Sequence, residues 1–151
     1  MPARRLRRVV SRLQEVVAEG PEVVSYGSDA ISPEAAYACL RPVLDDRPTE
    51  EFWVLLLDGR HRVLGLAQVT VGTLTASLVH PREVFGPAIR LGAAGLIVAH
   101  NHPSGDPEPS TEDLEVTRRL LEVGKLVGIP LLDHLVMGDG SFVSLRRRMG
   151  F

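Results

Sequence analysis

The order of apolar and polar residues along the chain predicts both helices and strands. Apolar positions recur at helical spacing in four stretches bounded by proline, glycine or a capping residue. These predicted helices lie before Gly20, from Pro33 to about Leu44, from Pro81 to about Leu91 and from about Thr111 to Val127. Shorter runs that are mostly apolar or that alternate with period two predict strands. The predicted strands lie within Glu50 to Asp58, Arg62 to Gly72, Gly95 to His102, Leu131 to Met137 and Ser141 to Leu145.

Two turn signals join neighbouring strands into hairpins. Asp58-Gly59 separates the first two predicted strands, and Gly138-Asp139-Gly140 separates the last two. Helices connect the other elements, so the sequence predicts an α/β fold of the mixed α+β kind, with a mixed sheet flanked by helices. We expect this domain to occupy residues 29–151. Residues 1–28 are expected to form a basic amphipathic helix and a linker.

Composition narrows the class of protein. The chain of 151 residues is 44% hydrophobic and 24% charged, which is typical of a globular domain that buries a core of its own. Cys39 is the single cysteine, so an internal disulfide and a cysteine-based zinc ribbon are excluded. The sequence has neither an apolar run long enough to cross a membrane nor the apolar region of a signal peptide. We therefore expect a cytoplasmic protein without a membrane partner.

The net charge of -2 hides an uneven distribution. Residues 1–12 contain five arginines and no acidic residue, and residues 146–148 are all arginine, so the rest of the chain is acidic. Arginine-rich ends could contact the phosphates of a nucleic acid. The simpler interpretation is a solvated helix face at one end and a solvated tail at the other.

Residues 99–114, AHNHPSGDPEPSTEDL, contain the candidate chemistry. Alternate side chains of a strand share a face, so His100 and His102 point the same way at the strand end and Asn101 points the other way. Two imidazoles on one face can share a metal ion, and catalytic zinc takes three protein ligands and a water. Asp113 is the candidate third ligand if the proline-rich loop turns the chain back. Alternatively, Ser110-x-x-Asp113 is only a helix capping box.

The spacing His-x-His, seven residues, Ser, two residues, Asp resembles the JAB/MPN metalloenzyme motif, which also has an upstream glutamate. The more specific string His-Asn-His-Pro-Ser-Gly at residues 100–105 is similar to the bacterial RadC family. Residues 50–57, 79–85 and 133–135 agree with the same family, and the resemblance covers roughly residues 29–151. It implies an MPN/JAB domain, with a mixed sheet like that of cytidine deaminases.

The resemblance also implies residue roles. His100, His102 and Asp113 would bind zinc as the cofactor. Ser110 would hydrogen-bond the reacting water or the developing oxyanion. Glu50 would be the general acid/base.

Glu51 is the alternative to Glu50 as the acid/base. Period-two alternation allows only one of these two side chains to face the metal. Glu50 is preferred because the family pattern places its glutamate two residues before a phenylalanine, here Phe52.

These roles predict a zinc-dependent hydrolase that cleaves an amide or isopeptide bond of a peptide or protein substrate with a metal-activated water. One alternative is a nucleic-acid-binding protein associated with DNA repair, including a metal-dependent nuclease. The other alternative is a non-catalytic MPN scaffold. Separately, the amphipathic N-terminal helix could form a homodimer contact.

The chain departs from the family pattern at two points. Deubiquitinating members carry Ser or Thr where Asn101 stands, and residues 1–28 have no room for the helix-hairpin-helix domain usual in RadC proteins.

The remaining histidines and the tryptophan have less specific predictions. His80 precedes a proline at a helix start and is expected to cap or pack. His134 either supports the metal ligands or is a satisfied core or surface residue. His61, beside a turn, is expected to be exposed, and Trp53 is expected in the core.

Overall fold

The computed structural model describes residues 27–72 and 79–151, so the predicted N-terminal helix and its arginines lie outside the described residues. The helices are α1 (Pro33–Leu44), α2 (Pro81–Leu91), α3 (Thr111–Val127) and α4 (Leu145–Met149). The strands are β1 (Glu51–Leu57), β2 (Val63–Val71), β3 (Gly95–Asn101), β4 (Leu131–Met137) and β5 (Phe142–Ser144). The predicted elements from α1 to β4 are therefore present, with ends that differ by one or two residues.

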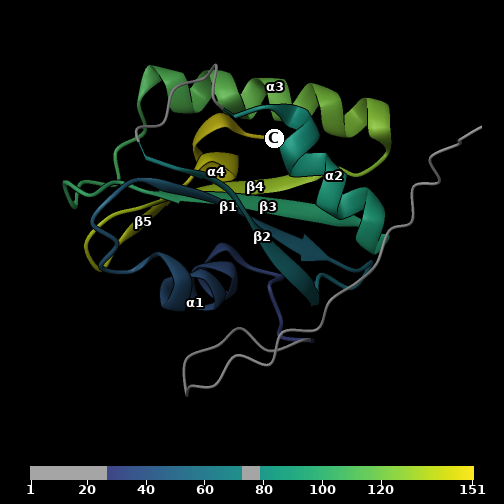
Figure 1. Ribbon diagram of the computed structural model, residues 1–151, viewed down its shortest axis with the longest axis horizontal. Coiled ribbons are helices and arrows are strands. Elements are labelled where there is room, and N and C mark those ends of the chain that lie inside the picture. The colour runs from purple at the N-terminus through teal and green to yellow at the C-terminus, as the bar shows by residue number, and fades with distance from the viewer. Residues whose placement is uncertain (1–26, 73–78) are drawn as a thin grey trace, which may run out of the picture.

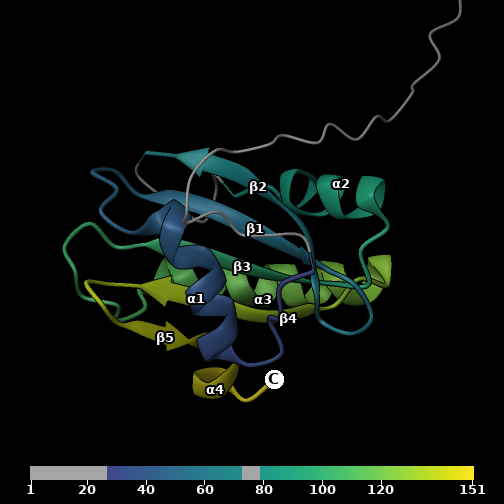
Figure 2. The same ribbon diagram turned by 90° about the horizontal axis from the view of Figure 1, so that it is seen from below.

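The five strands form one mixed sheet in the order β2-β1-β3-β4-β5. β3 and β4 run parallel, with α3 between them in the chain, and the other neighbouring pairs are antiparallel. Helix α1 lies on one face of the sheet, and α2 and α3 lie on the opposite face (Figures 1 and 2). The predicted fold class, a mixed sheet flanked by helices, is confirmed.

Each face of the sheet has its own apolar core, because alternate residues of the central strands point to opposite sides. Phe52 and Val54 of β1 pack with Leu120 of α3 on one face. Leu55 of β1 packs with Leu40 of α1 on the other. All residues of β3 are buried, so this strand runs through the middle of the molecule and ends at its polar residues.

Capping residues set the helix boundaries as the sequence predicts. The Ser32 hydroxyl accepts a hydrogen bond from the Ala35 amide at the start of α1. At the start of α3, Ser110 and Asp113 form a capping box. Helix α3 ends at Gly128, which has the left-handed conformation with φ 80°.

The three C-terminal arginines are exposed to solvent, as the simpler interpretation expects, but they lie on a short helix instead of a tail. The last strand ends at Ser144, whose hydroxyl accepts a hydrogen bond from the Arg147 amide and caps α4. The buried Asp133 carboxylate accepts a second bond from the Arg146 amide. Arg147 forms a two-point ion pair with Glu34. Tertiary contacts, rather than local periodicity, therefore order this segment.

Arg148 pairs with Glu108 at 2.8 Å, so two of the three C-terminal arginines are in ion pairs. Two of the less specific predictions also change, and a third holds in part. His61 is half-buried, with φ 58°, instead of exposed. His80 occupies the N-cap position of α2, but its side chain is exposed and makes no capping hydrogen bond. Trp53 is half-buried and packs against the apolar core between the sheet and α1.

No helix in residues 27–72 and 79–151 is long and apolar enough to span a membrane.

Candidate metal centre

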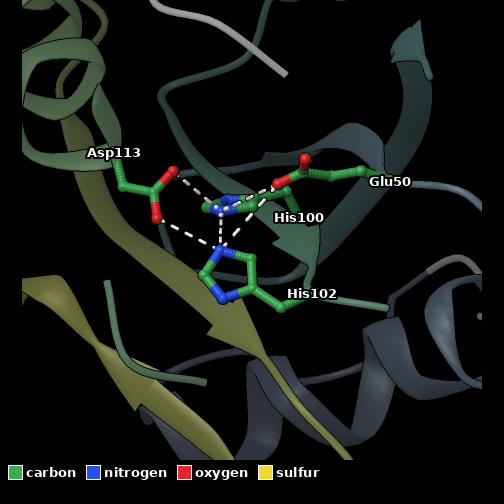
Figure 3. A group of neighbouring side chains, drawn as sticks. All are labelled: Glu50, His100, His102 and Asp113. Carbon is green, nitrogen blue, oxygen red and sulfur yellow. Dashed lines mark hydrogen bonds and ion pairs between the residues drawn. The ribbon is translucent and has the colours of Figure 1, made fainter. Parts of the chain in front are cut away.

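The predicted site residues come together where β3 ends. His100 and His102 project to the same side of the strand, with their Nε2 atoms 3.1 Å apart (Figure 3). Asp113, from the first turn of α3, faces both rings. Its Oδ1 lies 3.0 Å from Nε2 of His100 and its Oδ2 lies 3.2 Å from Nε2 of His102. The side chains of His100 and Asp113 are buried, and that of His102 is 17% exposed.

Backbone hydrogen bonds fold the loop of residues 103–109 so that Asp113 returns over the histidines. The Gly105 amide donates to the His102 carbonyl, and the Asp139 amide donates to the Gly105 carbonyl. The His102 amide donates to the Met137 carbonyl of β4. Gly105 has φ 88°, a conformation that glycine adopts without strain. The strand end and the loop are therefore tied to the last residue of β4 and to the turn that follows it.

Asp113 is a helix cap as well as a neighbour of the histidines. Its Oδ2 accepts a hydrogen bond of 2.8 Å from the Ser110 amide, and its own amide donates to the Ser110 hydroxyl. Burial raises the energy of the charged carboxylate, but hydrogen bonds from His100 and His102 outweigh it and lower the pKa of Asp113 far below its usual range. The two interpretations of this stretch, cap and ligand, thus describe one geometry.

Glu50 precedes β1 and points toward the histidines. Its Oε1 is 3.8 Å from Nε2 of His100 and 3.9 Å from Nε2 of His102. Glu51 turns the other way, and its carboxylate accepts hydrogen bonds from Gln68 and Trp53. The structure therefore brings Glu50, and not Glu51, to the candidate site.

Asn101 holds the strand end on either side of Glu50. Its Oδ1 accepts a hydrogen bond of 2.8 Å from the Glu51 amide, and its Nδ2 donates to the Thr49 carbonyl at 3.0 Å. The asparagine is 5% exposed, and its bond to the Glu51 amide is buried. The residue between the two histidines thereby positions the acid/base candidate from the next strand.

The second nitrogen of each histidine also has a partner. His102 Nδ1 lies 2.8 Å from the Asp106 carbonyl oxygen, which can only accept, so Nδ1 carries the proton there. His100 Nδ1 lies 2.8 Å from Nε2 of His134. The hydrogen bond to Asp113 raises the pKa of His102, while full burial and the neighbouring His100 lower the pKa of His134. His134 is therefore a neutral, buried contact of the site.

The spacing of the candidate ligand atoms fits a tetrahedral zinc ion. Zinc bonds of about 2.0 to 2.1 Å imply ligand atoms about 3.3 Å apart. The two Nε2 atoms of His100 and His102 are 3.1 Å apart, and they lie 3.0 and 3.2 Å from the Oδ1 and the Oδ2 of Asp113, respectively. Glu50 lies farther away, although the ligand atoms of all four residues lie within 4.8 Å of one another. Two imidazoles and one carboxylate could thus hold the ion, with Glu50 beside the remaining position.

Comparison with known proteins places this geometry in a family. The RadC-like JAB domain model matches residues 30–151. The chain belongs to this family. A UPF0758 protein of Geobacter sulfurreducens is 54% identical over 113 residues, which are 75% of this chain and 49% of that protein. For a UPF0758 protein of Symbiobacterium thermophilum the identity is 52%, over 80% of this chain and 51% of the other.

A UPF0758 protein of Methanosarcina acetivorans is 49% identical over 115 residues, 76% of this chain and 50% of that protein. The chain thus spans about half the length of the curated relatives that it matches.

In this RadC-like JAB domain the candidate ligands lie beside an open cleft of about 430 Å³. Glu50, His102, Pro103, Ser104, Ser110, Glu112 and Asp113 line the cleft. Because the Ser110 hydroxyl oxygen accepts from the Asp113 amide, its own hydrogen remains available to donate. A larger hollow of about 530 Å³, near the start of α1 and α4, includes none of the four candidate ligand residues.

Sequence reasoning missed the residues that support this RadC-like JAB domain's site. Thr117 has its hydroxyl 2.7 Å from Nδ1 of His134 and lies one helical turn after Asp113. That four-residue spacing on one helix face was the available signal. Asp106 and Asn101 left no such signal, because their partners depend on loop shape and strand pairing.

Proposed function

We propose that this RadC-like JAB domain is a zinc-dependent hydrolase that cleaves an amide or isopeptide bond of a peptide or protein substrate. The observation that supports it is that the Nε2 atoms of His100 and His102 and the Asp113 carboxylate approach one another within about 3 Å, with the Glu50 carboxylate less than 4 Å from both Nε2 atoms. Zinc bound there would supply a water acidified toward neutral pH. A binding-only domain would have no need for the Glu50 carboxylate at that position.

The protein's own groups would then divide the chemistry among them. Glu50 accepts the proton of the attacking water and passes it to the leaving nitrogen, since its carboxylate faces the cleft beside the ligand atoms. The Ser110 hydroxyl donates a hydrogen bond to the substrate oxygen as negative charge develops on it. Asn101 keeps Glu50 in place through the backbone on either side of it.

The alternative of a metal-dependent nuclease is less favoured by the charges around the cleft. Three of the described residues that line the cleft are acidic: Glu50, Glu112 and Asp113. The described lining residues include no lysine and no arginine. A polyanion would meet acidic groups there. Arg147 and Arg148 are already paired with Glu34 and Glu108, which reduces the positive charge that the C-terminal segment offers to phosphates.

Metal analysis and turnover together test the proposal. Wild-type protein should hold close to one equivalent of zinc and cleave members of a quenched fluorescent library of peptides and isopeptide-linked peptides. Asp113→Ala should lose the zinc. Glu50→Gln should keep the zinc and lose turnover by about 100-fold or more, because it removes the proton acceptor and not a ligand. Glu83→Gln, an exposed change on α2, is the matched control and should leave both unchanged.

Two results would contradict the proposal. One is wild-type protein with less than about a tenth of an equivalent of zinc and no gain on reconstitution. The other is full turnover by Glu50→Gln.

A further inference from the structure

A buried chain of hydrogen bonds connects two of the three candidate ligands, Asp113 and His100, behind the site. It runs from the Asp113 carbonyl oxygen to the Thr117 hydroxyl, on to His134 and then to His100. The three contacts are 2.7, 2.7 and 2.8 Å long. Thr117, His134 and His100 are each 0% exposed, so water cannot replace any of these partners. The chain links α3, β4 and β3.

Counting the protons fixes the direction of every bond in this chain. The Thr117 hydroxyl has one hydrogen, and the Asp113 carbonyl can only accept it. The hydroxyl oxygen must therefore accept from His134, so Nδ1 of His134 carries a hydrogen. In a neutral imidazole the other nitrogen is then an acceptor. Nε2 of His134 thus accepts from His100 Nδ1–H.

This direction leaves the correct nitrogen of His100 for a metal. With Nδ1 protonated, it is Nε2 of His100 that faces Asp113 and His102. Without a metal, a proton on this Nε2 can donate to the Asp113 carboxylate, and zinc would displace that proton. The opposite arrangement would put a hydrogen from His134 Nε2 onto His100 Nδ1 and a permanent proton on His100 Nε2. Phe52 keeps the rings oriented, since it stacks on His100 and meets His134 edge-on.

We propose that Thr117 and His134 are positioning residues that set the tautomer of His100 and thereby prepare the site for zinc. The proposal rests on the function proposed above. Because both ends of the chain lead to candidate ligands, a change in its middle should weaken the ligation of His100 and disturb the turn that carries Asp113. Residues that hydrogen-bond the second nitrogen of a ligating histidine typically contribute about 10- to 100-fold to metal affinity.

Two matched variants of Thr117 test this role. Thr117→Val keeps the shape of the side chain and removes the hydroxyl, so His134 loses the partner that selects its tautomer. We expect its zinc dissociation constant, measured by competition with a chromophoric chelator, to rise by about 10- to 100-fold. Thr117→Ser restores the hydroxyl and should restore wild-type affinity. Equal affinity of Thr117→Val and wild type would overturn the proposal.

A second measurement does not depend on any variant folding. Nitrogen-15 NMR of the histidine rings in wild-type zinc-loaded protein reports which nitrogen of His134 carries the hydrogen. We expect the Nδ1–H tautomer. Zinc-binding protein with the Nε2–H tautomer would overturn the inference and leave the proposed function standing. Wild-type protein that binds no zinc would overturn the proposed function, and this inference with it.

Discussion

Replacing Gly138 by alanine should weaken zinc binding without touching a ligand. Gly138 begins the turn between β4 and β5 and packs against the loop of residues 103–109. A methyl group there would collide with the Gly105 carbonyl oxygen and lie 2.7 Å from Cδ and 2.9 Å from N of Pro107. These atoms belong to backbone or a proline ring and cannot rotate aside. The loop would have to move as a unit.

The expected size of the effect follows from what the loop holds. Forcing a methyl group into a packed contact costs about 1–3 kcal/mol of stability. The displaced loop carries the Asp106 carbonyl, which accepts the hydrogen bond that orients His102. Loss of such a bond lowers metal affinity by about 10- to 100-fold, which is about 1.4 to 2.8 kcal/mol of binding free energy.

The assay compares the zinc affinity and thermal stability of Gly138→Ala with those of Gly140→Ala, a change at a second glycine of the same turn. Gly140 has φ 64° and nothing within 4 Å of an added methyl group. Gly140→Ala should therefore cost about 1–2 kcal/mol of stability through backbone strain and leave zinc affinity unchanged. Wild-type affinity in Gly138→Ala, or an equal loss in Gly140→Ala, would refute the link between the loop and His102.

Two further substitutions separate positioning from packing. Asn101→Ala leaves the Glu51 amide and the Thr49 carbonyl without their partner, which should cost about 1–3 kcal/mol of stability. It should also lower kcat at unchanged zinc content, and zinc loss instead would contradict the role given to this side chain. Leu120→Ala empties a buried position in the core under α3 and should lower the free energy of unfolding in urea by about 2–5 kcal/mol. A loss well below this range would mean that α3 packs less tightly than the structure shows.

Local signals were sufficient for most of the fold. Ser32 and Ser110 mark helix starts because their hydroxyls satisfy free backbone amides in the first turn. β1 was predictable from its apolar run, since both faces of this central strand are covered. Helix α4 was not predictable, because its five residues include three arginines and its start depends on Asp133 of β4.

In the candidate site, too, residues with a local sequence signal were predictable, and residues placed by tertiary contacts were not. The placement of His100 and His102 followed from the period of a strand, and the choice of Glu50 over Glu51 followed from the family pattern and the same period. Thr117 and His134 meet only because α3 crosses the sheet between two parallel strands, β3 and β4. That crossing is a property of the topology, so the four-residue spacing on α3 places Thr117 near Asp113, but no local pattern reveals its contact with His134.

Asp113 is a helix cap and also a proposed zinc ligand, which explains why its sequence signal looked ambiguous. As a helix cap, its carboxylate accepts a hydrogen bond from the Ser110 amide and is fixed at the start of α3. The same carboxylate faces both histidines, and its charge is maintained by the hydrogen bonds that lower its pKa. A metal that binds there meets a ligand whose rotamer is already restricted, so less conformational entropy is lost on binding. Capping and ligation are therefore not competing explanations of Ser110-x-x-Asp113, because the cap is what orients the carboxylate toward the two imidazoles.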